Sequence, residues 1–146
     1  MARQNKKRPI VTVGALVFNT RDEALFVFTH KWKNTYGIPG GKIEYGEKSR
    51  EAVIRELKEE TGLTIKPSEV FLVQDCIDSR EFYKANCHFI LINYLATTKT
   101  KAVKLNDEAQ SYLWMKPKEA LKLKLNRPTR VLVEAYLSRQ IVKNVF

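Results

Sequence analysis

Residues 41–63 constrain this chain more strongly than any other segment, because they combine a helical pattern with a closely spaced set of acids. The helical pattern covers residues 48–61, and Gly62 stands where a left-handed C-terminal cap is expected. At about 100° per residue, three carboxylates of this helix share an arc of about 100°. The three are Glu56, Glu59 and Glu60. The sequence therefore predicts a helix with one strongly acidic face.

An apolar arc adjoins the acidic face and consists of Val53, Ile54 and Leu57. Acids at the edge of a buried face are shielded from water, so they repel one another unless a cation lies between them. Mg²⁺ and Mn²⁺ prefer such hard oxygen ligands, and two-metal sites are assembled from clusters of this kind. An E-x-x-E-E pattern alone is more typical of a solvated helix face, so the prediction of a metal site depends on the surrounding residues.

The surrounding residues follow a spacing pattern from Gly41 to Leu63. The pattern is G-x5-E-x7-R-E-U-x-E-E-x-G-U, where U is a bulky aliphatic residue, and the chain fills all nine fixed positions. They are Gly41, Glu47, Arg55, Glu56, Leu57, Glu59, Glu60, Gly62 and Leu63. With ordinary residue frequencies, fewer than about one sequence in a million would match by chance. The segment resembles the signature of the Nudix hydrolase family.

The resemblance extends from about Ile10 to Leu137 and includes the lead-in Ile38–Gly41. It implies an α/β fold, a three-layer α/β/α sandwich around a mixed β-sheet. Enzymes of this family hydrolyse a nucleoside diphosphate linked to another group, with the help of a divalent metal. We therefore expect a pyrophosphohydrolase that uses Mg²⁺, or Mn²⁺, to activate a water molecule for attack on phosphorus.

The resemblance also implies which residues hold the metal. Glu56, Glu59 and Glu60 would bind it together with the backbone carbonyl of Gly40. The general base stays open between Glu56 and Glu108, since many family members place a late metal-binding or catalytic glutamate in the loop where Glu108 stands. We expect this loop to be free, so that Glu108 approaches the metal only when substrate and metal are bound.

Three further residues of the signature are expected to support the metal ligands. Arg55 would orient Glu47 or Glu59 through an internal ion pair. Glu47 would stabilise the start of the helix, where a carboxylate suits the helix dipole. Gly41, like its neighbour Gly40, would give the backbone freedom to approach a ligand closely.

Substrate choice is expected to depend on residues outside the signature. Trp32 and Tyr36 could stack on a nucleobase, because ring faces accept any base. Tyr83 lies nearest to the place where diadenosine polyphosphate hydrolases have a tyrosine, and Asp78 stands where many ADP-ribose hydrolases have a proline. A nucleoside triphosphate is thereby favoured over ADP-ribose, a nucleotide sugar or a dinucleoside polyphosphate. RNA-end hydrolysis and nucleotide sensing without cleavage are the alternatives of another class.

The hydrophobic pattern predicts one domain over residues 10–146, preceded by a basic arm at residues 1–9. The expected strands are residues 10–18, 24–30, 42–45, 70–77, 83–95 and 112–115. A short helix is expected from about Pro117, and a final helix from Asn126 or Pro128 to about Lys143.

The net charge of +10 comes from the two ends of the chain, because residues 10–115 contain 14 basic and 14 acidic residues. Such an excess suits anionic partners, among them phosphorylated small molecules and RNA. The basic ends lack a zinc-finger or RNA-binding aromatic motif, so RNA is not favoured. We expect a small-molecule nucleotide as the partner of a monomer or homodimer.

The location of the protein is expected to be cytoplasmic. Cys76 and Cys87 belong to no CxxC or Cys/His cluster, which favours a reduced protein. The basic N-terminus followed by an apolar run is similar to a signal peptide, but the run is short and no small-residue cleavage site follows it. No other run is long enough to span a membrane, so no membrane partner is expected.

Overall fold

A mixed sheet forms the middle layer of the structure, a computed structural model that describes residues 6–145, with side chains described to residue 140. Its described residues form the strands β1 (Ile10–Phe18), β2 (Ala24–Thr29), β3 (Thr35–Gly37), β4 (Gly40–Lys42), β5 (Lys66–Ile77), β6 (His88–Thr97) and β7 (Ser111–Met115). The helices are the 3₁₀ helix η1 (His30–Trp32), α1 (Ser49–Thr61), α2 (Pro117–Ala120) and α3 (Arg127–Val145). Residues 1–5 of the predicted basic arm lie outside the described residues.

Strand β1 organises the sheet, whose order is β3-β2-β1-β6-β5, with β4 paired to β1 and β7 paired to β2. β1 pairs in parallel with β6, where Val13 lies opposite Ile92, and antiparallel with β4, where Gly14 lies opposite Gly40. Its pairing with β2 is confined to Phe18 and Ala24 at the strand end. β2 and β4 therefore share one edge of β1, and the glycines of β4 come against its middle.

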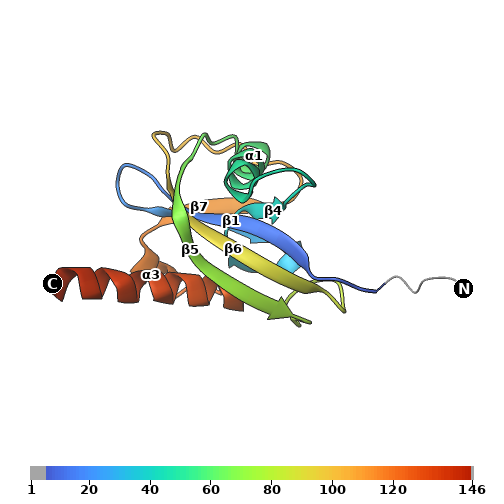
Figure 1. Cartoon of the computed structure of the whole chain (residues 1–146). Helices are drawn as coiled ribbons and strands as arrows, with labels where there is room; N and C mark the ends of the chain where they lie inside the picture. Colours follow the sequence, from blue (N-terminus) through green and yellow to red (C-terminus); the bar gives the residue numbers. More distant parts are fainter. Residues whose placement is uncertain (1–5, 146) are drawn as a thin grey trace, which may run out of the picture.

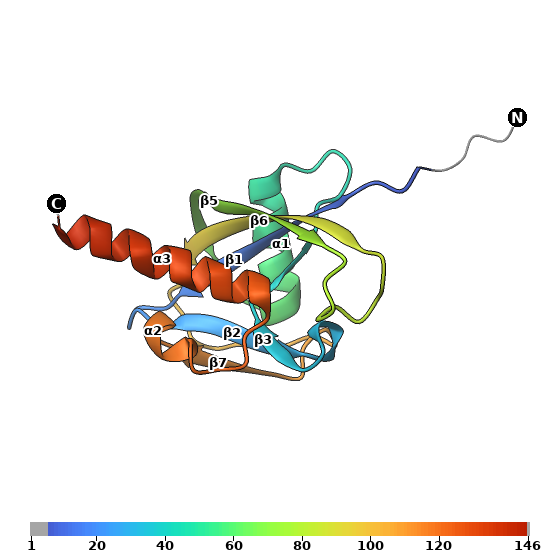
Figure 2. The same ribbon diagram turned by 90° about the horizontal axis from the view of Figure 1, so that it is seen from below.

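The helices cover the two faces of this sheet. Figure 1 shows α1 above the sheet and α3 below it, and Figure 2 shows α3 running across the lower face beside α2. This is the α/β/α sandwich around a mixed sheet that the sequence predicts, and that prediction is confirmed. Within the described residues, no helix has the length and apolar character needed to cross a membrane.

Each face of the sheet carries its own apolar cluster. Between the sheet and α1, Val13, Val53 and Leu57 are among the residues that pack together with 2% or less of their surface exposed. On the α3 face, Leu16 and Leu132 belong to the second cluster. Alternate residues of β1 thus serve opposite layers, as the two-residue period of a strand requires.

Several predicted elements agree with the structure in position. β1, β2, α1, β7, α2 and α3 all lie within about three residues of the ranges predicted from the sequence. Gly62 ends α1 in the left-handed conformation, with φ of 74°, and its amide donates to the carbonyl of Lys58 at 2.9 Å. These boundaries depend on local rules, which the sequence carries directly.

Four local predictions are wrong. The strand predicted at 83–95 begins only at His88, because Asp78 and Asn86 have positive φ and the chain between them forms a loop. β5 begins at Lys66 rather than at residue 70, with bulges that interrupt its pairing with β6. The short strand predicted at 42–45 lies instead at Gly40–Lys42, and β3 forms where a loop was predicted.

Candidate active site

The buried face of helix α1 includes one of its acids. Its buried residues are Ala52, Val53, Leu57, Glu60 and Thr61. Glu60 therefore lies inside the buried face, with only 8% of its surface exposed, rather than at its edge. Ile54, which the helical wheel assigns to the apolar arc, is 37% exposed. Compared with the apolar arc of the helical wheel, the buried face of α1 is shifted around the helix toward the acids, because α1 packs against both β1 and β4.

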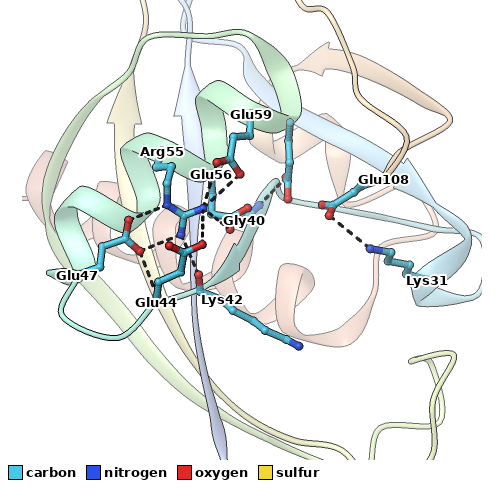
Figure 3. A network of polar contacts seen from close by, with 10 residues as sticks. Lys31, Gly40, Lys42, Glu44, Glu47, Arg55, Glu56, Glu59 and Glu108 are labelled. Atoms are coloured by element: carbon cyan, nitrogen blue, oxygen red, sulfur yellow. Dashed lines mark hydrogen bonds and ion pairs between the residues drawn. The ribbon is translucent and has the colours of Figure 1, made fainter.

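Three carboxylates converge at this point, from two separate segments of the chain. Oxygen atoms of Glu56, Glu60 and Glu108 all lie within 4.8 Å of one another. Glu108 comes from the loop before β7, and Figure 3 shows it facing the acids of α1. Glu59 is not part of this group: its side chain is 54% exposed and lies 3.2 Å from the Arg55 guanidinium.

Burial controls the protonation of this cluster. It raises the pKa of Glu60, and a hydrogen bond with Glu108 raises it further. The same hydrogen bond lowers the pKa of Glu108. Burial also raises the pKa of Glu56, against the opposing effect of Arg55. Without a cation, Glu60 is therefore the protonated partner, and a cation between the carboxylates would take the place of its proton.

Arg55 connects the acids of α1 with the loop before the helix. Its Nε and Nη2 donate to the two carboxylate oxygens of Glu47 at 2.7 and 2.8 Å. Its Nη1 donates to Glu56 at 3.0 Å, and Nη2 also donates to the carbonyl of Lys42 at 3.1 Å. The guanidinium points at protein acceptors rather than into open space, which makes it an orienting group for Glu56 (Figure 3).

The two glycines of β4 allow the helix and the sheet to approach closely. A Cβ on Gly40 would lie 2.1 Å from the Val13 carbonyl oxygen, and one on Gly41 would lie 2.4 Å from the Glu56 carboxylate. Gly40 also donates its amide to Glu60 at 2.9 Å. Its N–H thus fixes one of the three acids, while the role of its carbonyl as a metal ligand stays a prediction.

The loop that carries Glu108 is held in place rather than free, contrary to the sequence-based expectation. The Thr29 hydroxyl donates to the Glu108 carbonyl at 3.0 Å, and the Asn106 amide donates to the Glu60 carbonyl at 3.2 Å. Lys31 Nζ lies 3.6 Å from the Glu108 carboxylate. Glu108 is therefore placed beside the α1 acids before any ligand arrives.

A cleft of about 700 Å³ adjoins the carboxylates. Glu56 and Glu108 line it on one side, and Trp32 and Tyr83 belong to an aromatic wall elsewhere in its lining. Tyr36 is not among the lining residues, because its ring packs against Phe28, with ring centroids 5.1 Å apart, and joins the α3-side cluster. Of the three aromatic residues proposed for the substrate, two therefore reach the cleft.

The aromatic wall includes residues that sequence reasoning missed. Phe82 lies 4.9 Å from Trp32 and 5.0 Å from Phe89, centroid to centroid, and all three line the cleft. Lys31, which lies beside Glu108, was also missed. Phe82 falls just before the strand predicted at residues 83–95, and the hydrophobic pattern carries no signal for a cleft-lining loop.

The residues of this site fit a divalent cation. Three hard oxygen donors lie within 4.8 Å of one another, and one of them is nearly buried. Burying several carboxylates together is costly unless a proton or a cation compensates. Mg²⁺ and Mn²⁺ match this donor set by preference for carboxylate oxygen.

Comparison with known proteins agrees with this geometry. A model of the NUDIX domain matches residues 8–136 of the chain. The chain belongs to the Nudix family. The nucleoside triphosphatase NudI of Escherichia coli K12 is 31% identical to this Nudix chain over 109 residues, which cover 71% of this chain and 74% of that protein. As a Nudix enzyme, the protein is a pyrophosphohydrolase.

Solved structures of other Nudix proteins share the fold. The MutT protein from Methanosarcina mazei Go1 superposes with a TM-score of 0.78 at 25% identity, covering 93% of this chain and 99% of that one. The NUDIX domain of Shewanella oneidensis NrtR, solved with ADP ribose, has a TM-score of 0.74 at 19% identity, covering 96% and 94%. At that identity the second likeness concerns the fold alone.

Proposed function

We propose that this Nudix enzyme hydrolyses nucleoside triphosphates with Mg²⁺ held by Glu56, Glu60 and Glu108. The observation that carries the proposal is the convergence of these three carboxylates within 4.8 Å, beside a cleft with an aromatic wall. The curated relatives at 30% and 31% identity bear the name nucleoside triphosphatase, which supports the choice of substrate. A cytoplasmic location and use of Mn²⁺ in place of Mg²⁺ belong to the same proposal.

The residues along the cleft have different proposed roles. When bound, a divalent cation supplies charge for the phosphate oxygens and lowers the pKa of a coordinated water. Trp32 and Tyr83 offer ring faces for the base. Lys31, whose ammonium lies 3.6 Å from Glu108, adds positive charge where the phosphates would lie. Arg55 keeps Glu56 in place through the 3.0 Å hydrogen bond.

We assign the role of general base to Glu108. Its side chain is 47% exposed and lines the cleft, whereas that of Glu56 is 13% exposed and held by Arg55. A carboxylate open to the cleft can reach an attacking water, and loss of a positioned base costs about 10²- to 10⁴-fold in rate. Since Glu108 also belongs to the carboxylate cluster, its substitution is expected to weaken metal binding too, by less than substitution of Glu60.

A substrate panel with Mg²⁺ tests the proposed function. It compares nucleoside triphosphates with ADP-ribose, a nucleotide sugar, a dinucleoside polyphosphate and capped RNA, and it identifies the phosphate products. The highest kcat/KM is expected for a nucleoside triphosphate, with activity lost on addition of a chelator. A higher kcat/KM for any other class would contradict the substrate assignment.

The assignment of the base has its own test. Glu108→Gln is expected to lower kcat by at least about tenfold, while calorimetric titration shows a smaller loss of Mg²⁺ affinity than in Glu60→Gln. Near-wild-type turnover of Glu108→Gln, combined with a large loss in Glu56→Gln, would transfer the role to Glu56.

A further inference from the structure

The loop between β5 and β6, residues 78–87, forms part of the aromatic wall of the cleft. Phe82 at its centre packs between Trp32 and Phe89, with ring centroids 4.9 and 5.0 Å apart. The position of this loop therefore decides where the ring of Phe82 stands and how much space lies before Trp32. In Figure 2 the loop reaches from the ends of β5 and β6 toward η1, which carries Trp32.

One side of the loop is attached to helix α3. The Glu81 carboxylate accepts a hydrogen bond from the Arg127 amide at 2.8 Å, across 46 positions of the sequence. Arg127 is the first residue of α3, and the first amides of a helix have no partner within it. A carboxylate at this position also complements the positive end of the helix dipole.

The rest of this helix start is already satisfied. The Thr129 amide donates to the Asn126 side chain at 3.0 Å, and the Arg130 amide donates to the Asn126 carbonyl at 3.0 Å. Pro128 has no amide hydrogen. Glu81 therefore supplies the acceptor that the Arg127 amide needs, and the helix in turn fixes the carboxylate.

The other side of the loop is attached to η1. The Tyr83 amide donates to the Lys31 carbonyl at 2.8 Å. Glu81 and Tyr83 are the two neighbours of Phe82, so the ring is held between one contact to α3 and one to η1. Asn126 and Thr129 at the start of α3 also line the cleft, which means that Glu81 joins two of its walls.

We propose that Glu81 is a positioning residue for the nucleobase: through its hydrogen bond to the Arg127 amide it keeps Phe82 packed against Trp32, and this keeps in place the aromatic wall on which a base would stack. This inference rests on the proposed hydrolysis of nucleotides. Glu81 itself is not among the residues that line the cleft, and it belongs to neither apolar cluster. It acts on the substrate through the loop.

Glu81 does not belong to the carboxylate cluster and is hydrogen-bonded to α3, which gives the proposal a distinctive kinetic signature. Its loss should weaken binding of the base in the ground state and the transition state alike, so KM rises while kcat stays nearly constant. A probe without a base, inorganic triphosphate, would bind through the metal and the cations of the cleft and would not need the aromatic wall. Its inhibition constant should therefore be the same in wild type and variant.

The kinetic experiment compares Glu81→Ala with wild type on a nucleoside triphosphate. KM is expected to rise about tenfold with kcat changed less than about twofold, since part of the base stacking is lost. Glu81→Gln keeps an oxygen acceptor for the Arg127 amide and should restore KM to within about threefold of wild type. Glu119→Ala is the matched control. Glu119 lies on α2, and among the described residues its carboxylate forms an ion pair only with the exposed Lys122, just beyond that helix.

A binding measurement gives a readout that needs no turnover. The chain has two tryptophans, Trp32 and Trp114, so in a Trp114→Phe background the fluorescence reports on Trp32. A nucleoside without phosphates is expected to quench it, and adding Glu81→Ala should shift the midpoint to about tenfold higher concentration. Melting temperatures of all variants are measured alongside, to show that each is folded at the assay temperature.

Two results would overturn the role of Glu81. One is a Glu81→Ala variant whose KM and nucleoside midpoint equal those of wild type. The other is an equal loss for the nucleoside triphosphate and for inorganic triphosphate, which would indicate a general distortion of the cleft. Failure of the proposed function looks different, because the wild-type enzyme itself would then not hydrolyse nucleoside triphosphates.

Discussion

At the scale of single residues, Gly41 shows how one hydrogen atom in place of a side chain serves the site. A Cβ there would lie 2.4 Å from the carboxylate of Glu56, which is the mobile end of a side chain and can move away. At Gly40, the Cβ would instead lie 2.1 Å from the carbonyl oxygen of Val13 in the neighbouring strand. The missing side chain at Gly41 thus leaves room for the carboxylate cluster, and the missing side chain at Gly40 leaves room for the pairing of β4 with β1.

Gly41→Ala is therefore expected to remain folded and to lose activity. Displacement of Glu56 by about an ångström should lower kcat/KM by about tenfold to hundredfold, with an unchanged far-UV circular dichroism spectrum. Gly40→Ala should instead lower the melting temperature, because backbone atoms have to shift. Tyr45→Ala is the control, since Tyr45 lies in the loop just after β4 and is fully exposed. Wild-type activity of Gly41→Ala would show that Glu56 needs no such space.

Glu47 makes the stability of the folded protein depend on pH. Its hydrogen bonds with Arg55 lower its pKa from an ordinary value of 4.5 to about 2. Because the folded pKa is depressed, the contribution of this pair to stability is complete above pH 4.5 and is lost as the pH falls toward 2.

The free energy of unfolding of the wild type is thus expected to fall more steeply between pH 4.5 and pH 2 than that of Glu47→Gln. Urea denaturation at several pH values in this range measures both slopes. Parallel curves for the two proteins would mean that Glu47 titrates alike in the folded and unfolded states.

At the scale of elements, neighbouring side chains of helix α1 have different roles: some pack against the sheet, and others form the carboxylate cluster. Leu57 is 0% exposed in the cluster between α1 and the sheet, whereas Ile54 is 37% exposed. The helix therefore stays in place through Leu57 and its buried neighbours, and this fixes the positions of Glu56 and Glu60.

Truncation of the two apolar residues is expected to separate these contributions. Leu57→Ala should lower the free energy of unfolding by about 2–5 kcal/mol, since it leaves a cavity under α1. Ile54→Ala should change it by less than about 1 kcal/mol. Chemical denaturation with equal m-values provides the comparison, and a small effect of Leu57→Ala would show that the layer can collapse around the missing side chain.

At the scale of the whole molecule, the carboxylate cluster links metal binding to stability. Glu60 is 8% exposed and lies among other acids, so the metal-free fold bears the cost of burying it. A cation that binds only the folded state stabilises it, by about 2.7 kcal/mol at a concentration of 100 times its Kd.

Mg²⁺ is accordingly expected to raise the melting temperature of the wild type by about 5–10 °C at that concentration. Glu60→Gln should lose this rise while its metal-free form melts at or above the wild-type temperature. Differential scanning calorimetry with sodium chloride at matched ionic strength provides the control. An equal rise in both proteins would place the bound cation elsewhere.

The sequence alone determined the features that follow from short-range rules. The bounds of α1, the left-handed cap at Gly62 and the gathering of acids on one helix face all depend on residues within a few positions of one another. The spacing from Gly41 to Leu63 was enough to indicate the family, because it combines such local features. Helical period and glycine geometry act within the segment, so no knowledge of the rest of the chain was needed.

The tertiary structure decided which of these residues meet. Glu108 joins Glu56 and Glu60 because β7 pairs with β2, with Ser111 opposite Phe28, and this register brings the loop before β7 to the end of α1. Glu59, on the same helical arc, faces solvent and Arg55 instead. Tyr36 packs against the cluster on the α3 face, and Phe82 lines the cleft. These outcomes depend on strand order and register, which are set by contacts between distant segments, and local patterns in a sequence carry no record of them.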